Sequence, residues 1–140
     1  MTVTYNQGDE LVWHDYFKVH EEKVDEQHSR IVVLINSLIE ACKRGDAQEQ
    51  LGDALYFLAN YVVEHFNYEE YLMDEYDLPG KEQHKAIHDE FKQTAGTLVK
   101  QYDTNGASDE LCETLTNVVC CWLVTHITNE DIKTFENLHL

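Results

Sequence analysis

Apolar residues recur along most of this chain in alternating steps of three and four, as they do on the buried face of an α-helix. The first such segment covers about residues 21–43. Its apolar stripe consists of Ile31, Ile35, Leu38 and Cys42. A further step of three back from Ile31 reaches His28, so a histidine occupies the first layer of a face that packs against other helices.

A second segment, about residues 47–74, continues the pattern but includes charged and polar positions. Its stripe consists of Leu51, Leu55, Leu58, Val62, His65, Glu69 and Leu72. His65 and Glu69 therefore stand where the pattern otherwise places leucine. A buried carboxylate without a partner is costly, so we expect a cation to lie against Glu69.

Two more helical segments follow. The third covers about residues 79–102, and Pro79 is suited to open it. Its stripe consists of His84, His88, Phe91, Ala95, Leu98 and Tyr102. The fourth begins after a loop at Gly106, with Ser108 or Asp109 as its cap. Its stripe consists of Leu111, Leu115, Val118 or Val119, Trp122 and His126.

Four helices joined by short loops predict an all-α fold, an up-down-up-down four-helix bundle. We expect a single domain over residues 1–140, because the chain has no internal repeat, linker or low-complexity segment. Residues 1–19 lack helical periodicity and predict an extended N-terminal arm, followed by the bundle at 20–131 and a tail at 132–140. We expect the arm to pack its aromatic side chains over the bundle: Trp13, Tyr16 and Phe17.

This topology brings the candidate ligands to one end of the bundle. They are His28 at the start of the first helix, His65 and Glu69 near the end of the second, His84 and His88 at the start of the third, and His126 near the end of the fourth. Asp131 follows at the same end. The other three histidines, His14, His20 and His139, lie outside these stripes, and we expect them to be exposed and not to bind metal.

Five imidazoles and two carboxylates are too many for one octahedral ion and suit a pair of ions that the carboxylates bridge. Zinc would favour four ligands and often sulfur, whereas magnesium and calcium avoid so many imidazoles. A mixed imidazole and carboxylate set favours iron, with manganese as the second choice.

The overall charge limits the partners. The formal net charge is −17, from 27 acidic and ten basic residues, so we expect the protein to bind neither nucleic acid nor an anionic membrane. The first ten residues do not resemble a signal peptide, and we expect no stretch that could span a bilayer. The four cysteines predict reduced thiols in a cytoplasmic protein: Cys42, Cys112, Cys120 and Cys121.

Taken together, the motifs resemble those of the bacterial hemerythrins. The resemblance extends from about Trp13 to Phe135 and rests on four segments: Asp25-Glu-Gln-His28, His65-Phe66 with Glu69-Glu70 and Met73, His84-Lys-Ala-Ile-His88-Asp-Glu-Phe91, and Trp122-Leu-Val-Thr-His126-Ile127 ending in Asp131. Each segment alone is a weak signal, whereas their joint occurrence in this order is strong.

The resemblance implies a role for each residue. It assigns His84, His88 and His126 to one six-coordinate iron, and His28 and His65 to a second. Glu69 and Asp131 would bridge the two iron ions together with an oxo or hydroxo group. Dioxygen would bind at the vacant position of the second iron.

The predicted oxygen pocket is apolar. Its residues flank the ligands in sequence and are Ile31, Phe66, Trp122, Leu123 and Ile127. None is an acid or base that could protonate bound oxygen, although ordinary core packing would also account for all five. Thr134 departs from the family pattern, which often has an aromatic residue there, and this leaves the packing beneath Asp131 open.

The spacing of the last two ligands predicts an irregular helix. Five residues separate His126 from Asp131, and five residues turn a regular α-helix through about 140°. Both side chains reach one site only if the helix widens into a π-type turn or ends between them.

These observations predict a monomeric protein that is not an enzyme and that reversibly binds dioxygen for storage, delivery or scavenging. One alternative is an oxygen- or redox-sensing domain of a signalling system. Another is a di-iron oxidase, peroxidase or nitric-oxide scavenger, against which the absence of pocket acids argues. Whether the chain is free-standing or part of a longer protein stays open.

Overall fold

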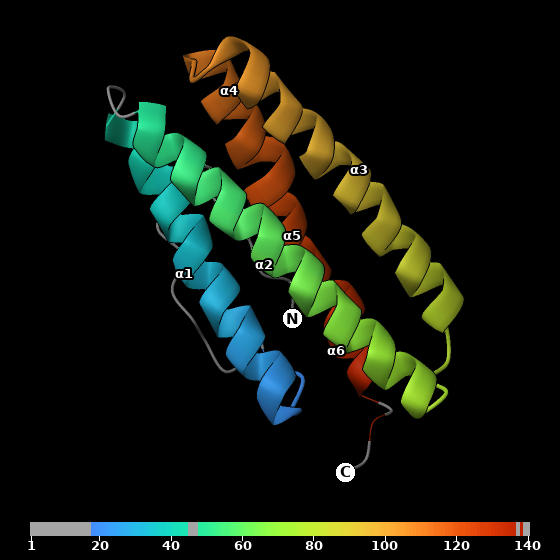
Figure 1. Cartoon of the computed structure of the whole chain (residues 1–140). Coiled ribbons are helices and arrows are strands. Elements are labelled where there is room, and N and C mark those ends of the chain that lie inside the picture. Colours follow the sequence, from blue (N-terminus) through green and yellow to red (C-terminus); the bar gives the residue numbers. More distant parts are fainter. Residues whose placement is uncertain (1–17, 45–47, 137, 139–140) are drawn as a thin grey trace.

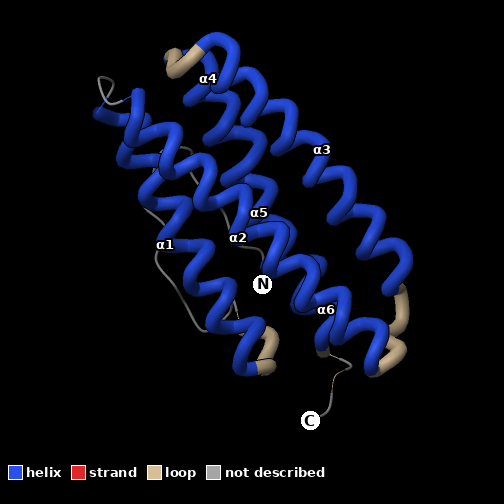
Figure 2. The backbone as a smooth tube through the Cα atoms, in the orientation of Figure 1, coloured by secondary structure: helices blue, strands red, loops and turns tan. Residues whose placement is uncertain are grey.

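The computed structural model describes residues 18–44, 48–136 and 138. The described residues form helices and loops without strands, in four antiparallel columns (Figures 1 and 2). The first three columns are α1 (Glu22–Arg44), α2 (Gln48–Glu75) and α3 (Lys81–Asn105). The fourth is continuous and consists of α4 (Asp109–Thr114), η2 (Leu115–Cys120), α5 (Cys121–Thr125), η3 (His126–Asp131) and α6 (Ile132–Phe135). The predicted all-α, up-down-up-down bundle is confirmed.

Local hydrogen bonds explain where two of the helices begin. The Glu21 carboxylate accepts a hydrogen bond from the backbone N–H of Val24 at 2.6 Å, at the start of α1. Ser108 caps α4, as predicted, by accepting a hydrogen bond from the N–H of Leu111 at 3.0 Å. Both contacts satisfy backbone donors that the first turn of a helix leaves without a partner.

Two predicted boundaries are wrong. Helix α3 begins at Lys81, after Gly80 adopts a left-handed conformation with φ of 79°, so Pro79 lies in the preceding turn. A glycine accommodates that conformation without a steric penalty. At the other end, the fourth column continues past residue 131 to Phe135, because Phe135 is buried against the core.

Two expectations concern residues outside the described part of the chain. They are the aromatic packing of Trp13, Tyr16 and Phe17 in the N-terminal arm, and the exposure of His14 and His139. His20 is exposed, as predicted.

The core consists of two apolar clusters with a polar layer between them. The larger cluster includes Ile31 of α1 and Phe66 of α2, whereas the smaller one includes Val24 and Leu72 of the same two helices. His28 and Glu69 lie between these positions along α1 and α2 and are fully buried. The candidate ligands therefore occupy one layer that is closed on both sides by hydrocarbon.

The cysteine prediction needs a correction. A disulfide joins Cys42, near the end of α1, to Cys112 in α4, across 70 residues of sequence. Cys120 and Cys121 are unpaired. Nothing in the spacing of the cysteines indicated this pair, because its two members approach each other only when the first and fourth columns pack side by side.

The fourth column also differs from its sequence prediction. Residues Asp109–Phe135 are long and apolar enough to cross a membrane by length and composition, although 50% of the most apolar window is buried inside the protein. Because this helix carries inward-facing His126 and Asp131 and forms part of the bundle core, we interpret it as a core helix.

The wide turn η2, which we did not predict, changes the register so that Val119 is buried and Val118 is exposed.

Candidate metal centre

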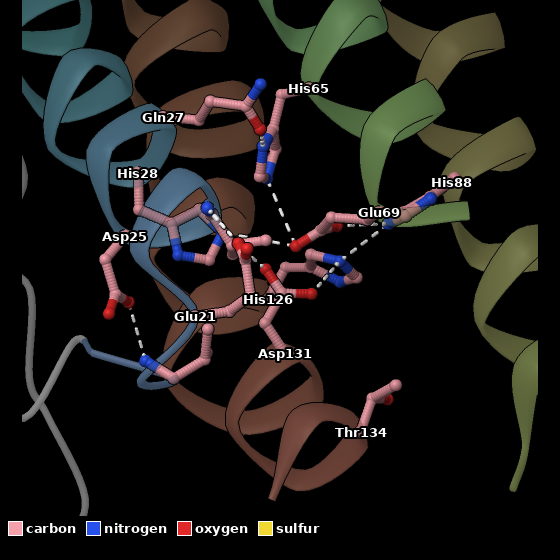
Figure 3. A network of polar contacts seen from close by, with 12 residues as sticks. Glu21, Asp25, Gln27, His28, His65, Glu69, His88, His126, Asp131 and Thr134 are labelled. Atoms are coloured by element: carbon pink, nitrogen blue, oxygen red, sulfur yellow. Dashed lines mark hydrogen bonds and ion pairs between the residues drawn. The ribbon is translucent and has the colours of Figure 1, made fainter. Parts of the chain in front are cut away.

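All four columns contribute side chains to one buried cluster (Figure 3). Its seven members are His28 from α1, His65 and Glu69 from α2, His84 and His88 from α3, and His126 and Asp131 from η3. None is more than 4% exposed. The structure thus brings together every residue that the sequence analysis named as a candidate ligand.

Helix geometry explains how each column delivers its side chains. The pairs on α2 and α3 are four residues apart, which places both members on one face of a regular helix. His126 and Asp131 are five apart and lie at the two ends of the π-helical segment η3. A π turn has more residues per turn than an α-helix, so the five-residue offset returns to the same face. The predicted irregularity is confirmed.

The cluster divides into two groups that share both carboxylates. In one group, Asp131 Oδ1 lies 3.0 Å from Nε2 of both His84 and His126, and Glu69 Oε1 lies 3.2 Å from Nε2 of His88. In the other group, Asp131 Oδ2 lies 2.9 Å from Nε2 of His28, and Glu69 Oε2 lies 3.2 Å from Nε2 of His65. Each carboxylate therefore directs one oxygen towards the three-histidine group and the other oxygen towards the two-histidine group.

Nitrogen atoms also converge within the larger group. Nε2 of His126 lies 3.2 Å from Nε2 of His84 and 3.1 Å from Nε2 of His88. Imidazole nitrogens that all carry lone pairs repel one another at this distance unless a proton or cation lies among them. The nitrogens in this group face a common point, as metal ligands do.

The polar atoms of the cluster fit a bound cation. Both oxygens of Glu69, both oxygens of Asp131, and Nε2 of His28 and His65 are buried without a hydrogen-bond partner. An unsatisfied buried polar atom costs about 1–3 kcal/mol, and more if the group is charged. Metal coordination would satisfy these atoms together, so the donor set fits a pair of metal ions.

The buried imidazoles and carboxylates of the cluster shift one another's pKa values. Burial lowers the pKa of His28, but the adjacent carboxylates of Asp131 and Glu69 outweigh it and raise that pKa to about 9. Burial raises the pKa of Asp131, but His126, His28 and His84 outweigh it and hold that pKa well below its ordinary value. Burial lowers the pKa of His65. In the absence of metal, a proton on His28 thus compensates for ionised carboxylates.

Aromatic rings pack directly against the imidazoles. Phe66 stacks on His88, with ring centroids 3.8 Å apart and planes 4° apart. Trp122 stacks on His126, with centroids 4.5 Å apart. Ile31, Leu123 and Ile127 are also buried in the larger apolar cluster, while Trp122 is half-buried at its margin. All five predicted pocket residues thus lie in or against the larger apolar cluster, and none of them is an acid or base.

Sequence reasoning missed three residues that contact the outer nitrogens of the ligands. Nδ1 of His65 lies 2.7 Å from Gln27 Oε1, Nδ1 of His84 lies 2.7 Å from Thr134 Oγ1, and Nδ1 of His88 lies 3.1 Å from Glu70 Oε2. Gln27 and Glu70 adjoin ligands in sequence, which was the only available signal. Thr134, which departs from the family pattern, hydrogen-bonds a ligand and is buried beneath Asp131.

Comparisons with known proteins agree with this arrangement. The family model described as hemerythrin HHE cation binding domain matches residues 19–138. A bacteriohemerythrin of Pseudomonas aeruginosa is 30% identical over 121 residues, which cover 86% of this chain and 76% of that protein. A bacteriohemerythrin of Methylococcus capsulatus is 34% identical over 107 residues, 76% of this chain and 79% of that protein.

A eukaryotic relative and a solved structure extend the similarity. A hemerythrin-like protein of Naegleria gruberi is 31% identical over 121 residues, covering 86% of this chain and 87% of that protein. The crystal structure of a hemerythrin point mutant superimposes with a TM-score of 0.78 at 26% identity, covering 90% of this chain and 97% of that one. With the family model spanning nearly the whole bundle, and seven buried imidazoles and carboxylates in two groups, the chain belongs to the hemerythrin family.

Proposed function

We propose that this protein reversibly binds dioxygen at a non-haem pair of iron ions held by the seven buried residues. The observation that carries the proposal is the division of the cluster into two groups that share Glu69 and Asp131. Two groups that share both carboxylates match two ions at bridging distance. The family resemblance suggests iron as the metal and dioxygen as the ligand.

The two groups differ in the number of ligands that they offer. His84, His88 and His126 supply three imidazoles to one position, and the shared carboxylates and a solvent-derived bridge would complete six ligands there. His28 and His65 supply only two imidazoles to the other position, which leaves one place for an incoming small molecule. The iron pair would supply the electrons and the open coordination place that dioxygen binding requires.

The apolar residues of the predicted oxygen pocket favour binding over further reaction. Ile31, Phe66 and Ile127 are buried and apolar, so they exclude water and cannot deliver a proton. Cleavage of the oxygen–oxygen bond needs proton donors close to the oxygen atoms. We therefore favour a carrier, store or scavenger of dioxygen over an oxidase, peroxidase or nitric-oxide scavenger. A sensing role would use the same site, with a further partner.

We infer that the apolar fourth column is a core helix of a soluble protein, because half of its most apolar window is buried inside the bundle. A monomeric state stays a prediction. A cytoplasmic location stays a prediction, and the disulfide between Cys42 and Cys112 removes the cysteine argument for it.

The test compares His28→Ala with His88→Ala. Iron content is measured beside the visible charge-transfer band that develops when the reduced protein is aerated. We expect His28→Ala to abolish the reversible band before all iron is lost, because His28 serves the position with the open place. We expect His88→Ala to weaken iron binding at the three-histidine position.

The control is His20→Asn, which changes an exposed histidine outside the cluster and suits its φ of 68°. It should keep two irons per chain and the full band. A His28→Ala protein with two irons and a normal, reversible band would show that oxygen binds elsewhere, and a wild-type protein with one ion or mainly zinc would contradict the iron pair.

A further inference from the structure

The residues that contact the outer nitrogens of the histidine ligands differ in charge between the two groups. Nε2 of His65, His84 and His88 faces the shared carboxylates, where a metal ion would bind. An imidazole that binds a metal through Nε2 carries its proton on Nδ1, so each of these rings would donate a hydrogen bond outward. The acceptors are the amide oxygen of Gln27 for His65, the hydroxyl of Thr134 for His84 and the carboxylate of Glu70 for His88. Among the described residues, the acceptor with a formal negative charge is Glu70, which serves the three-histidine group.

The kind of acceptor changes the ligand. An amide or hydroxyl oxygen fixes the orientation and tautomer of an imidazole. A carboxylate does the same and also draws the Nδ1 proton towards itself, which makes Nε2 a more basic ligand. A more basic ligand binds a cation more tightly and stabilises the higher oxidation state of a redox metal.

The surroundings of Glu70 leave much of its charge effective. Its side chain is 22% exposed, and the nearest cation, Lys92 Nζ, lies 4.0 Å away. Lys92 is closer to Asp89, at 3.8 Å, and is itself 29% exposed. His88, in contrast, is fully buried, and Phe66 stacks on its ring. The hydrogen bond from His88 therefore joins a half-buried carboxylate to a ligand in a dry environment, where charge is poorly screened.

We propose that Glu70 is a positioning residue whose carboxylate makes the three-histidine position the tighter metal site and the more easily oxidised of the two. The amide of Gln27 is uncharged, so it adds no such charge to His65 at the two-histidine position. For oxygen chemistry this inference rests on the proposed function. The redox step is the loss of one electron from one ferrous ion to a one-electron outer-sphere oxidant, giving one ferric ion with no bond broken. The weaker, less oxidisable position is then the one with the open place.

The test uses matched variants that exchange amide and carboxylate at nearly constant shape. Glu70→Gln keeps an acceptor for His88 but removes the charge, whereas Gln27→Glu adds a charge behind His65. We expect Glu70→Gln to disfavour the first one-electron oxidation of the iron-loaded protein about tenfold, which is about 59 mV in midpoint potential. The double variant Glu70→Gln with Gln27→Glu should make the two-histidine position the first to be oxidised, and Mössbauer spectra of the half-oxidised protein would show the change of site.

A second arm needs neither iron nor oxygen. Stepwise cobalt(II) binding to the metal-free protein is followed by the visible bands of the bound ion. Glu70→Gln should weaken the tighter of the two steps by about ten- to a hundredfold, and Gln27→Glu should strengthen the weaker step. Glu70→Ala, which loses the hydrogen bond as well, should weaken the tighter step at least as much as Glu70→Gln.

The outcomes separate the two proposals. A wild-type protein that binds metal in two steps but shows no reversible band on aeration would reject oxygen binding and leave the role of Glu70 to be decided by cobalt affinity. A Glu70→Gln protein with wild-type potential and wild-type cobalt affinities would overturn the inference, because the charge would then have no effect. The same holds if Glu70→Ala alone weakens binding, since Glu70 would then act only by its shape and hydrogen bond.

Discussion

The two ends of this bundle are stabilised in opposite ways. At the metal end, seven titratable side chains are buried in one layer, and many of their polar atoms have no hydrogen-bond partner. At the far end, the same four columns meet through leucines, and a disulfide links α1 to α4. The leucines are Leu38, Leu51, Leu55, Leu98, Leu111 and Leu115, and all are buried.

The difference shows how the chain divides stability and function. Apolar contacts and a covalent link at the far end hold the four columns together without a ligand. The metal end contains charges that favour unfolding until cations neutralise them. The far end therefore keeps the ligands close to their positions before the metal ions bind.

Metal removal should have the largest effect. A ligand whose concentration is a thousand times its dissociation constant stabilises a folded protein by about 4 kcal/mol. Two buried ions should exceed this. We expect chelation to lower the melting temperature clearly and to speed amide hydrogen exchange around His28 and Glu69 more than around Leu51 and Leu111. Uniform exchange along all columns, or equal melting of both forms, would contradict the contrast between the ends.

Loss of the disulfide should destabilise the far end. A link across 70 residues restricts the unfolded chain by an amount worth about 4 kcal/mol in the loop-entropy account. We expect Cys42→Ser to lower the free energy of unfolding by that order, measured by urea denaturation, without changing the iron content. Cys121→Ser is the control, because Cys121 is unpaired and only half-buried. Equal stability of the two variants would show that the link is absent in solution.

Raising the pH should lower the free energy of unfolding of the metal-free protein but not that of the metal-bound protein. The pKa of His28 is about 9 in the folded metal-free protein and 6.5 in its ordinary state. The proton on His28 therefore adds stability that is complete below pH 6.5 and is lost as the pH rises through 9, a change of about 3 kcal/mol. Urea denaturation of the metal-free protein between these pH values measures it. His28→Gln should remove this dependence, and persistence of the slope in that variant would assign it to another group.

Two glycines should give the smallest effects, with opposite signs. A Cβ on Gly52 of α2 would overlap the Tyr102 side chain of α3, whereas a Cβ on Gly96 would meet nothing. We expect Gly52→Ala to destabilise the bundle by about 1–2 kcal/mol because Tyr102 must move. Gly96→Ala should stabilise it by up to about 1 kcal/mol through helix propensity. Thermal melts decide both, and a stabilising Gly52→Ala would show that Tyr102 adapts without cost.

Much of the metal centre could be predicted from the sequence because its spacing is local. His65–Glu69 and His84–His88 are one helical turn apart, so periodicity alone places each pair on one face. The five-residue spacing of His126 and Asp131 similarly required an irregular turn, which the structure contains. The alternation of helix direction then brought all the pairs to one end.

Other features depend on contacts that periodicity does not describe. The π-helical segment η2 determines that Val119 and not Val118 is buried. No pair of candidate ligands lies in η2, so the sequence did not indicate this irregularity. Gln27, Glu70 and Thr134 reach their imidazoles through side-chain directions that depend on how neighbouring helices are rotated. The far-end disulfide likewise required two distant columns to be adjacent at one height.

The sequence by itself determined which segments are helical and which faces are buried, because these follow from repeats within a single helix. The alternating direction of helices joined by short loops then placed the seven candidate ligands in one layer. Only the tertiary structure decided which carboxylate oxygen faces which imidazole group, what stands behind each ligand and which cysteines pair. These features depend on distances between columns of about 8–10 Å, where a small rotation of one helix changes a contact. Sequence spacing carries no measure of that rotation.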